Sequence, residues 1–160
     1  MSISDSINKV KDLVKQEKFE EAMTLADKLL AQVEDIQEEI GMLCDQKGYS
    51  LNKLGRAQKA LKFNDIAVAN CPANAICHCN RSFTLGVLGR HEESLEECEI
   101  AISLDPNYAM AWNNKANDLC RLGKPEEGLQ CVEKSLELDP TNESAIDTKE
   151  QILDALGRTD

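Results

Sequence analysis

Apolar and polar residues alternate along this chain with a spacing of three and four positions. The clearest stripe is a pair of leucines three residues apart that returns at a fixed step: Leu51 with Leu54, Leu85 with Leu88, and Leu119 with Leu122. This spacing places side chains on one face of an α-helix, so the chain is predicted to be helical throughout, without β-sheet. Small residues recur at the same step where two helices must approach closely: Gly48, Ser82 and Ala116, then Ala60, Ser94 and Gly128.

Turn-forming residues recur at the same interval along the sequence. Gly55, Gly89 and Gly123 are 34 residues apart, as are Pro72, Pro106 and Pro140. Glycine readily adopts the left-handed conformation that ends a helix, and proline disfavours helix at the residue before it. A period of about 34 residues is the signature of a solenoid of stacked helix pairs. The marks predict three units, over residues 41–74, 75–108 and 109–142.

The two ends of the chain depart from this pattern. A further unit is predicted over residues 3–36, but Glu17 occupies its turn-glycine position and four extra residues separate it from the next unit. Asp35-Ile36-Gln37-Glu38 has the form of a capping box, which predicts that the next helix begins about one turn early. After Pro140 the pattern predicts a last helix over about 143–157, which acts as a cap.

This pattern resembles the tetratricopeptide repeat family. The family's marks are clearest in Ala111-Trp112, Leu122-Gly123 and Leu136-Glu137-Leu138-Asp139-Pro140, and the match covers nearly the whole chain. The resemblance implies one domain over residues 1–160, an all-α, right-handed superhelical solenoid of tandem helix-turn-helix units with a C-terminal capping helix. It also implies a protein-interaction module.

In this family the first helix of each unit lines a concave groove that holds peptides. The residues that the resemblance implies for peptide binding are Asn8, Met42, Gln46, Tyr49, Ile76, Asn80, Phe83, Met110, Asn113, Asn114 and Asn117. Four of them share one position in successive units: Asn8, Gln46, Asn80 and Asn114. A carboxamide both donates and accepts hydrogen bonds, so this ladder is predicted to bind the backbone of an extended peptide. Two alternatives stay open: the carboxamides serve the fold, and the apolar members pack between helices.

The family also includes a clamp for chaperone tails, which grips a C-terminal carboxylate with lysine, asparagine and arginine at set places. The corresponding positions here are Asp45, Tyr49, Asn80, Met110 and Asn114. Only Asn80 fits the clamp. Recognition of chaperone C-termini is therefore not expected.

Charge narrows the choice of partner. The formal net charge is −11, with 29 acidic and 18 basic residues, which disfavours nucleic acid and anionic lipid as partners. Four cations are predicted on or near the groove against a single carboxylate, Asp45: Lys11, Lys15, Lys53 and Arg121. A mildly basic groove is expected to prefer neutral or acidic segments. The densest acidic run is predicted to be a solvated outer face: Glu92, Glu93, Glu96, Glu97 and Glu99.

Cysteine and histidine offer little evidence for a metal or redox site. Seven cysteines in a chain without a signal peptide or an apolar run of about 18 residues predict a cytoplasmic protein with reduced, buried thiols and no membrane contact. Cys71, Cys77, His78 and Cys79 are close together, but Cys77 and Cys79 lie about 200° apart on a helix. No metal or cofactor is therefore expected. Cys79 and Cys120 are predicted to face the groove and to react rapidly with alkylating reagents.

Catalysis has still less support. The chain has two histidines, His78 and His91, and it has no phosphate-binding loop, nucleophile elbow or pair of catalytic acids. We expect no enzyme. The favoured function is an adaptor or scaffold that holds an extended partner segment in its groove. The alternative is a structural protein that self-associates or joins a complex through its convex face or terminal cap. A monomer is expected, with a weak homo-oligomer left open.

Overall fold

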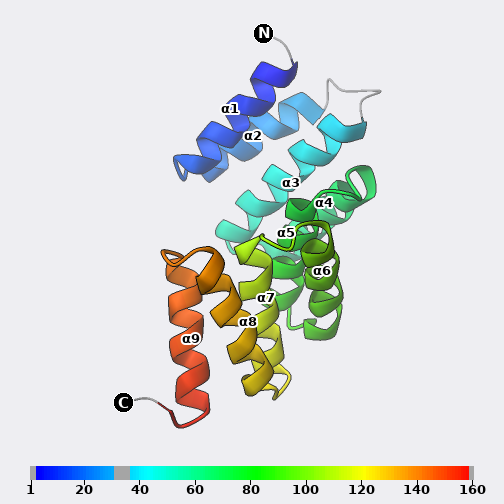
Figure 1. Cartoon of the computed structure of the whole chain (residues 1–160). Helices are drawn as coiled ribbons and strands as arrows, with labels where there is room; N and C mark the ends of the chain where they lie inside the picture. Colours follow the sequence, from blue (N-terminus) through cyan, green and yellow to red (C-terminus); the bar gives the residue numbers. More distant parts are fainter. Residues whose placement is uncertain (1–2, 31–36, 159–160) are drawn as a thin grey trace.

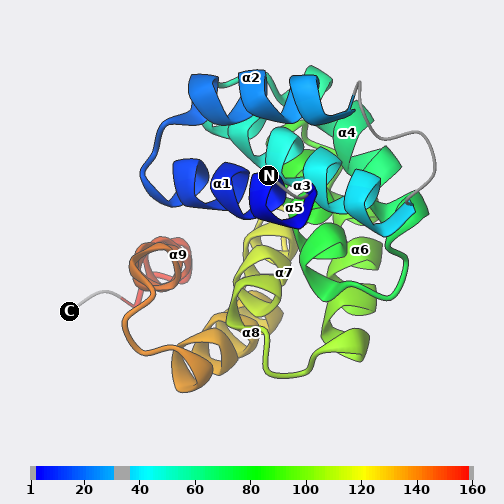
Figure 2. The same ribbon diagram turned by 90° about the horizontal axis from the view of Figure 1, so that it is seen from above.

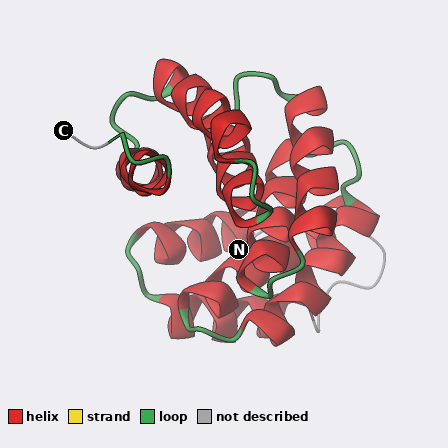
Figure 3. Cartoon of the chain, turned by 90° about the horizontal axis from the view of Figure 1, so that it is seen from below, coloured by secondary structure: helices red, strands yellow, loops and turns green. Residues whose placement is uncertain are grey.

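The computed structural model describes residues 3–30 and 37–158. These residues form nine α-helices and no strand: α1 (Ile3–Lys15), α2 (Phe19–Leu30), α3 (Gln37–Lys53), α4 (Ala57–Asn70), α5 (Ala75–Val87), α6 (His91–Leu104), α7 (Ala109–Arg121), α8 (Pro125–Leu138) and α9 (Glu143–Ala155). Figure 3 shows the helical ribbon from below. The predicted all-α repeat is confirmed.

The helices stack in pairs along the chain (Figure 1). Each odd-numbered helix contacts the next odd-numbered one, from α1 through α3, α5 and α7 to α9. The even-numbered helices contact only odd-numbered helices within the described residues. Seen from above in Figure 2, α2, α4, α6 and α8 lie on the outside, whereas α1, α3, α5 and α7 lie further in. The stack therefore curves, and the odd-numbered helices form its inner face.

The predicted close approach between helices is present. All six small residues that the sequence singles out are buried. A Cβ on Gly48 would lie 2.4 Å from the Asn64 Nδ2, and a Cβ on Gly128 would lie 2.9 Å from the Ala116 carbonyl oxygen. Larger side chains at these positions would thus push neighbouring helices apart.

The predicted glycine turns are confirmed by the backbone angles. Gly55, Gly89 and Gly123 have φ values of 71°, 75° and 77°. Each turn closes in the same way, as when the Arg56 N–H donates to the Leu51 carbonyl at 2.8 Å. Gly157, 34 residues beyond Gly123, has φ 64° and ends α9. The predicted cap is thus built like the first helix of a further unit, a signal that our reading of the sequence missed.

The first turn has the same geometry without glycine. Glu17 has φ 58°, and the Lys18 N–H donates to the Leu13 carbonyl at 2.9 Å. A residue with a Cβ pays about 1–2 kcal/mol for this left-handed conformation, so Glu17→Gly is expected to raise the free energy of unfolding by about 1 kcal/mol. Urea denaturation would measure the change. Gln16→Gly is the control, since Gln16 has a negative φ and gains no such relief; an equal effect of the two changes would contradict the argument.

The helix after the extra residues is longer than its equivalents. α3 has 17 residues, whereas α5 and α7 have 13 each, and α3 begins at Gln37, four positions before the predicted unit start at 41. Asp35 and Ile36, which begin the predicted capping box, lie outside the described residues. None of the described helices has both the length and the apolar character that a membrane span requires.

Candidate functional site

A pocket with a volume of about 260 Å³ lies on the inner face, between α5, α7 and α9. Four residues predicted for peptide binding line it: Phe83, Asn113, Asn114 and Asn117. Phe83 and its neighbour Val87 on α5 are 41% and 58% exposed. The pocket thus brings accessible apolar side chains next to a group of carboxamides on α7.

The carboxamide ladder connects the inner helices to one another. Asn80 on α5 donates Nδ2 to the Asp45 Oδ1 on α3 at 2.9 Å, and Gln46 donates Nε2 to the Asp45 Oδ2 at 3.3 Å. Asn114 on α7 is buried and donates Nδ2 to the Cys79 carbonyl at 3.2 Å and to the Ser82 Oγ at 3.1 Å. Asn8 is exposed. The amide nitrogens of Asn80 and Asn114 therefore hold neighbouring inner helices together, a role that the sequence left open.

Two further asparagines join α7 to α9. Asn117 donates Nδ2 to the Asn113 carbonyl at 3.2 Å and to the Thr148 Oγ1 at 3.0 Å. Asn113 donates Nδ2 to the Ser144 Oγ at 3.1 Å. The Asn113 Oδ1 is buried and has no hydrogen-bond partner, which is a rare and costly state for a polar atom.

The predicted apolar anchors divide into two groups. Ile76, Phe83 and Met110 are each more than 40% exposed, so they are available to a ligand. Met42 and Tyr49 are half-buried. The Met42 Sδ accepts a bond from Asn74, and the Tyr49 ring meets the Phe19 ring edge to face at 6.3 Å between centroids. For Met42 and Tyr49, packing within the fold accounts for much of the side chain.

Asp45 is fully buried, so the prediction that its carboxylate faces the groove is wrong. Burial raises the pKa of its carboxyl from 3.8 to about 6, although the Asn80 and Gln46 amides oppose the shift. The predicted cations remain available. Lys15, Lys53 and Arg121 are exposed and Lys11 is half-buried, and none of them forms an ion pair within the described residues.

His91 and Asp118 line one wall of the pocket, and the buried Ser94 lies behind them. The His91 Nδ1 lies 2.8 Å from the Asp118 Oδ1, and the Ser94 Oγ lies 2.5 Å from the Asp118 Oδ2 and 2.7 Å from the Ser82 carbonyl oxygen. Burial raises the pKa of the Asp118 carboxyl. A nucleophilic serine must donate to its base. The two hydrogen-bond neighbours of the Ser94 hydroxyl are a carbonyl and a carboxyl oxygen, so this arrangement is not a nucleophile paired with a histidine base.

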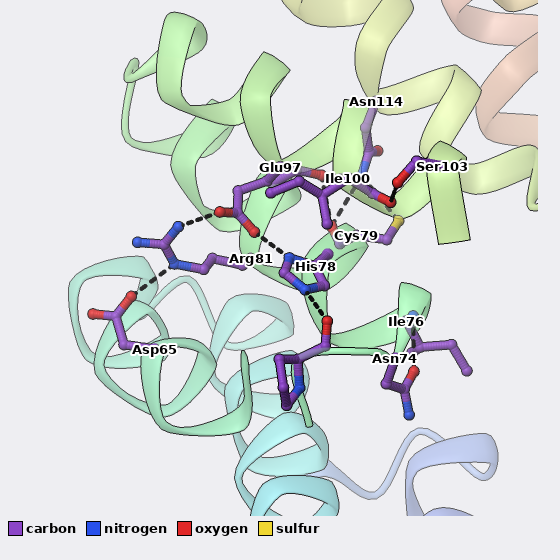
Figure 4. Close-up of polar contacts among 12 residues, drawn as sticks. Asp65, Asn74, Ile76, His78, Cys79, Arg81, Glu97, Ile100, Ser103 and Asn114 are labelled. Atoms are coloured by element: carbon purple, nitrogen blue, oxygen red, sulfur yellow. Dashed lines mark hydrogen bonds and ion pairs between the residues drawn. The ribbon is translucent and has the colours of Figure 1, made fainter. Parts of the chain in front are cut away.

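A second polar network lies between α4, α5 and α6 (Figure 4). The two ring nitrogens of His78 lie 2.7 Å from the Glu97 Oε2 and 2.9 Å from the Pro72 carbonyl. Arg81 donates Nη1 to the Glu97 Oε1 at 2.6 Å and Nε to the Asp65 Oδ1 at 2.8 Å. Glu97 is 7% exposed, so the predicted solvated acidic face is wrong at this residue.

The cysteines are free thiols, and six of the seven are buried. Cys77 and Cys79 belong to different apolar clusters, as their predicted separation around the helix requires. Within residues 3–30 and 37–158, no three ligand-type side chains are placed to hold a metal ion. Burial raises the pKa of the Cys44 thiol to about 11 and that of Cys98 to about 12, which lowers their reactivity.

Alkylation gives a direct test of this arrangement. Cys79 is 1% exposed, so the prediction that it faces the groove is wrong, because Asn114 lies against its thiol. Cys120 is half-exposed. Iodoacetamide is expected to label Cys120 at least tenfold faster than any other cysteine in the native protein, as followed by peptide mass spectrometry. Comparable labelling of Cys79 without denaturant would contradict the described helix register.

Comparisons with known proteins agree with the repeat pattern of the sequence and the paired helices of the fold. The tetratricopeptide repeat family model matches residues 109–142, which is the fourth predicted unit. No curated protein is significantly similar to the chain in sequence. The second TPR domain of human RPAP3, in complex with the HSP70 peptide SGPTIEEVD, aligns with a TM-score of 0.63 and 28% identity, over 72% of this chain and 94% of that one.

Two further structures extend the likeness. The first TPR of Spaghetti (RPAP3), bound to the HSP90 peptide SRMEEVD, has a TM-score of 0.68 and 25% identity, over 77% of this chain and 96% of that one. TTC0263, a thermophilic TPR protein in Thermus thermophilus, has a TM-score of 0.84 and 18% identity, over 98% of this chain and 84% of that one. The family model thus matches one of the repeats, and the paired helices with their repeated glycine turns form a tetratricopeptide-type helical repeat fold, similar to that of these solved structures.

Proposed function

We propose that this chain is a protein-interaction module that binds an extended segment of a partner protein along its inner face. One observation carries the proposal. The pocket between α5, α7 and α9 sets the exposed Phe83 and Val87 beside the carboxamides of Asn113, Asn114 and Asn117. Apolar surface next to hydrogen-bonding groups is what a peptide with mixed side chains and a polar backbone requires.

The charges support a neutral or acidic partner. Arg121, at the end of α7, lines the pocket, and Lys15 and Lys53 occupy the equivalent positions at the ends of α1 and α3. They form no ion pairs within the described residues. The net charge of −11 disfavours nucleic acid.

The RPAP3 domains bind acidic chaperone peptides, but the residues of this chain argue for a different ligand. At the five positions that correspond to the clamp of such domains, only Asn80 fits, and none of the five is a lysine or an arginine. Asp45 is an acid, and it is buried and bonded to Asn80 and Gln46. It therefore provides no positive charge to bind a C-terminal carboxylate. We therefore propose an internal extended segment as the ligand.

A peptide library would test the proposed function. Twelve-residue peptides of varied sequence would be screened for binding to the full chain, and affinities would be measured by fluorescence anisotropy. Micromolar dissociation constants are expected, about −8 kcal/mol, because the pocket is small and open. The double change Phe83→Ser with Val87→Ser is expected to weaken these peptides at least tenfold.

The matched control is Ile66→Ser with Ile100→Ser. These two side chains lie on α4 and α6, outside the pocket, and they are 40% and 38% exposed, close to the 41% of Phe83. The control is expected to bind as the unmodified chain does. If both double variants lose binding equally, or if no peptide depends on Phe83 and Val87, the ligand does not occupy the pocket.

A further inference from the structure

Ion pairs recur at one position where each even-numbered helix meets the next odd-numbered helix. A cation near the middle of the odd-numbered helix pairs with an acid on the helix before it: Lys47 with Asp27, Arg81 with Asp65 at 2.8 Å, Lys115 with Glu99 at 3.2 Å, and Lys149 with Glu133 at 3.1 Å. The four cations are 34 residues apart. Figure 4 shows the pair between Arg81 on α5 and Asp65 on α4. These junctions are therefore built to one plan.

Apolar side chains flank the acid of each pair, four residues before it and three residues after it. The four sets are Met23, Asp27 and Leu30; Leu61, Asp65 and Val68; Leu95, Glu99 and Ile102; and Leu129, Glu133 and Leu136. This spacing places the three side chains of a set on one face of the helix. The partner is a leucine four residues after the cation: Met23 shares an apolar cluster with Leu51 on α3, and Leu95 packs against the cluster that contains Leu119 on α7. One helix thus presents an acid between two apolar side chains, and the next receives it with a cation and a leucine.

The first helix, α1, carries the receiving half of this contact. Lys9 and Leu13 occupy the positions that Lys47 and Leu51 hold on α3, once the four extra residues between the first two units are counted. Lys9 is exposed and forms no ion pair within the described residues. Together with Leu25 on α2, these two side chains line an open groove of about 440 Å³. The start of the stack therefore has a receiving surface that no described helix covers.

The last helix, α9, carries the presenting half. Ile146, Glu150 and Leu153 repeat the spacing of the apolar and acidic side chains on the even-numbered helices. Ile146 is 40% exposed, Leu153 is half-buried, and Glu150 is exposed without an ion pair in the described part of the chain. None of the three lines the pocket between α5, α7 and α9. The two halves of the contact thus lie at opposite ends of the stack (Figure 1).

We propose that α9 of one molecule docks on α1 of a second copy of this chain, with Glu150 bound to Lys9 and with Ile146 and Leu153 packed on Leu13. The occupant is a second copy because the chain carries, one at each end, the two halves of a contact that it already makes at its internal junctions. The two copies use different surfaces, so association runs head to tail and can continue from copy to copy. The inference goes beyond the proposed function and uses none of the residues that line its pocket.

The charges at the two ends are complementary. The exposed acids of α9 form no ion pair within the described residues: Glu143, Asp147, Glu150 and Asp154. The groove on α1 and α2 has two exposed cations in the same state, Lys9 and Lys28, whereas its Glu20 is paired with Arg56 and only Glu21 is not paired. The net charge of −11 on each copy opposes association at long range, so the contact is expected to be weak.

Sedimentation equilibrium of the full chain would test the proposal. A contact of one helix on another is small, so the average mass is expected to rise from that of a monomer at about 10 µM to that of a dimer or longer assembly at about 500 µM. Lys9→Glu and Glu150→Lys each place like charges at the junction, and each is expected to raise the dissociation constant at least tenfold. An equimolar mixture of the two variants has opposite charges at every junction between unlike copies. The mixture is expected to associate as the unmodified chain does.

The matched controls make the same changes of charge away from both ends. Lys62 on α4 and Glu96 on α6 are exposed and form no ion pair within the described residues. Lys62→Glu and Glu96→Lys are expected to change the dissociation constant less than threefold. An unmodified chain that stays monomeric at about 500 µM would overturn the proposal. Equal effects of Lys9→Glu and Lys62→Glu, or a mixture of Lys9→Glu with Glu150→Lys that does not recover, would also overturn it.

Crosslinking would locate the contact directly. A carbodiimide joins an amine to a carboxylate that touches it, without a spacer. An equal mixture of unlabelled and heavy-isotope-labelled chains would be treated at high concentration, and crosslinked peptides would be identified by mass spectrometry. A peptide pair that joins Lys9 of one isotope to Glu150 of the other is expected. Crosslinks between copies that involve Lys9 but no acid of α9 would overturn the proposal.

Discussion

Replacement of Glu97 by alanine is expected to lower the free energy of unfolding by about 3–5 kcal/mol, because it breaks a buried, charged network. The carboxylate is 7% exposed and accepts bonds from Arg81 at 2.6 Å and from the His78 ring at 2.7 Å. Without it, a buried imidazole and a largely buried guanidinium lose a partner that holds α5 against α6. Urea denaturation at pH 7 would measure the loss.

The neighbouring glutamate provides the control. Glu96 is exposed on the same helix and has no ion pair within the described residues, so Glu96→Ala should change stability by less than about 0.5 kcal/mol. The two variants lose the same charge and the same helix-forming side chain. A similar cost in both would mean that the Glu97 network does not stabilise the fold.

The repeated architecture could be predicted because its boundaries are written in local chemistry. The left-handed backbone at Gly55, with φ 71°, favours glycine whatever surrounds the turn, and the same holds at Gly89 and Gly123. Their fixed step is visible without any knowledge of contacts. Gly157 belongs to the same series, so the sequence also held evidence that α9 is built like the helices of the inner face.

Burial of charged residues was harder to predict, although their helical spacing from small, buried residues was visible in the sequence. Glu97 lies three residues after Ser94 and four before Ala101, on the face that packs against neighbours. Asp45 lies four residues after Gly41 and three before Gly48, again on the buried face of its helix. Glu97 was assigned to solvent as part of an acidic run, and Asp45 was assigned to the groove by its position in the repeat. Their partners, His78, Arg81 and Asn80, come from neighbouring helices and could not be paired with them from spacing alone.

The sequence predicted which asparagines lie at the candidate site, but not how their side-chain amides are oriented. The sequence places Asn80, Asn114 and Asn117 on the inner face, and the pocket does include the last two. Which end of each amide faces the groove depends on acceptors from other helices, such as the Cys79 carbonyl. Such partners are fixed only when the repeats stack. Hydrogen-bond direction is therefore a property of the assembled solenoid and not of any single repeat.

Asp45→Asn is expected to stabilise the protein by about 3 kcal/mol at pH 8 and to have little effect below pH 4. Burial raises the pKa of the Asp45 carboxyl from 3.8 to about 6, and every tenfold weakening of acid strength on folding costs the ionised form about 1.4 kcal/mol. Between these two pKa values the folded protein binds more protons than the unfolded chain, so wild-type stability falls as pH rises from about 4 to 6. Above pH 6 the ionised, buried carboxylate keeps its full cost.

The measurement is the difference in unfolding free energy between Asp45→Asn and wild type, from urea denaturation at several pH values. Subtraction removes the contribution of other groups, such as Asp118, whose pKa burial also raises. A difference that does not change with pH would show that Asp45 is not ionised at a cost. Asp45→Glu is unsuitable as a control because its longer side chain would overpack a fully buried site.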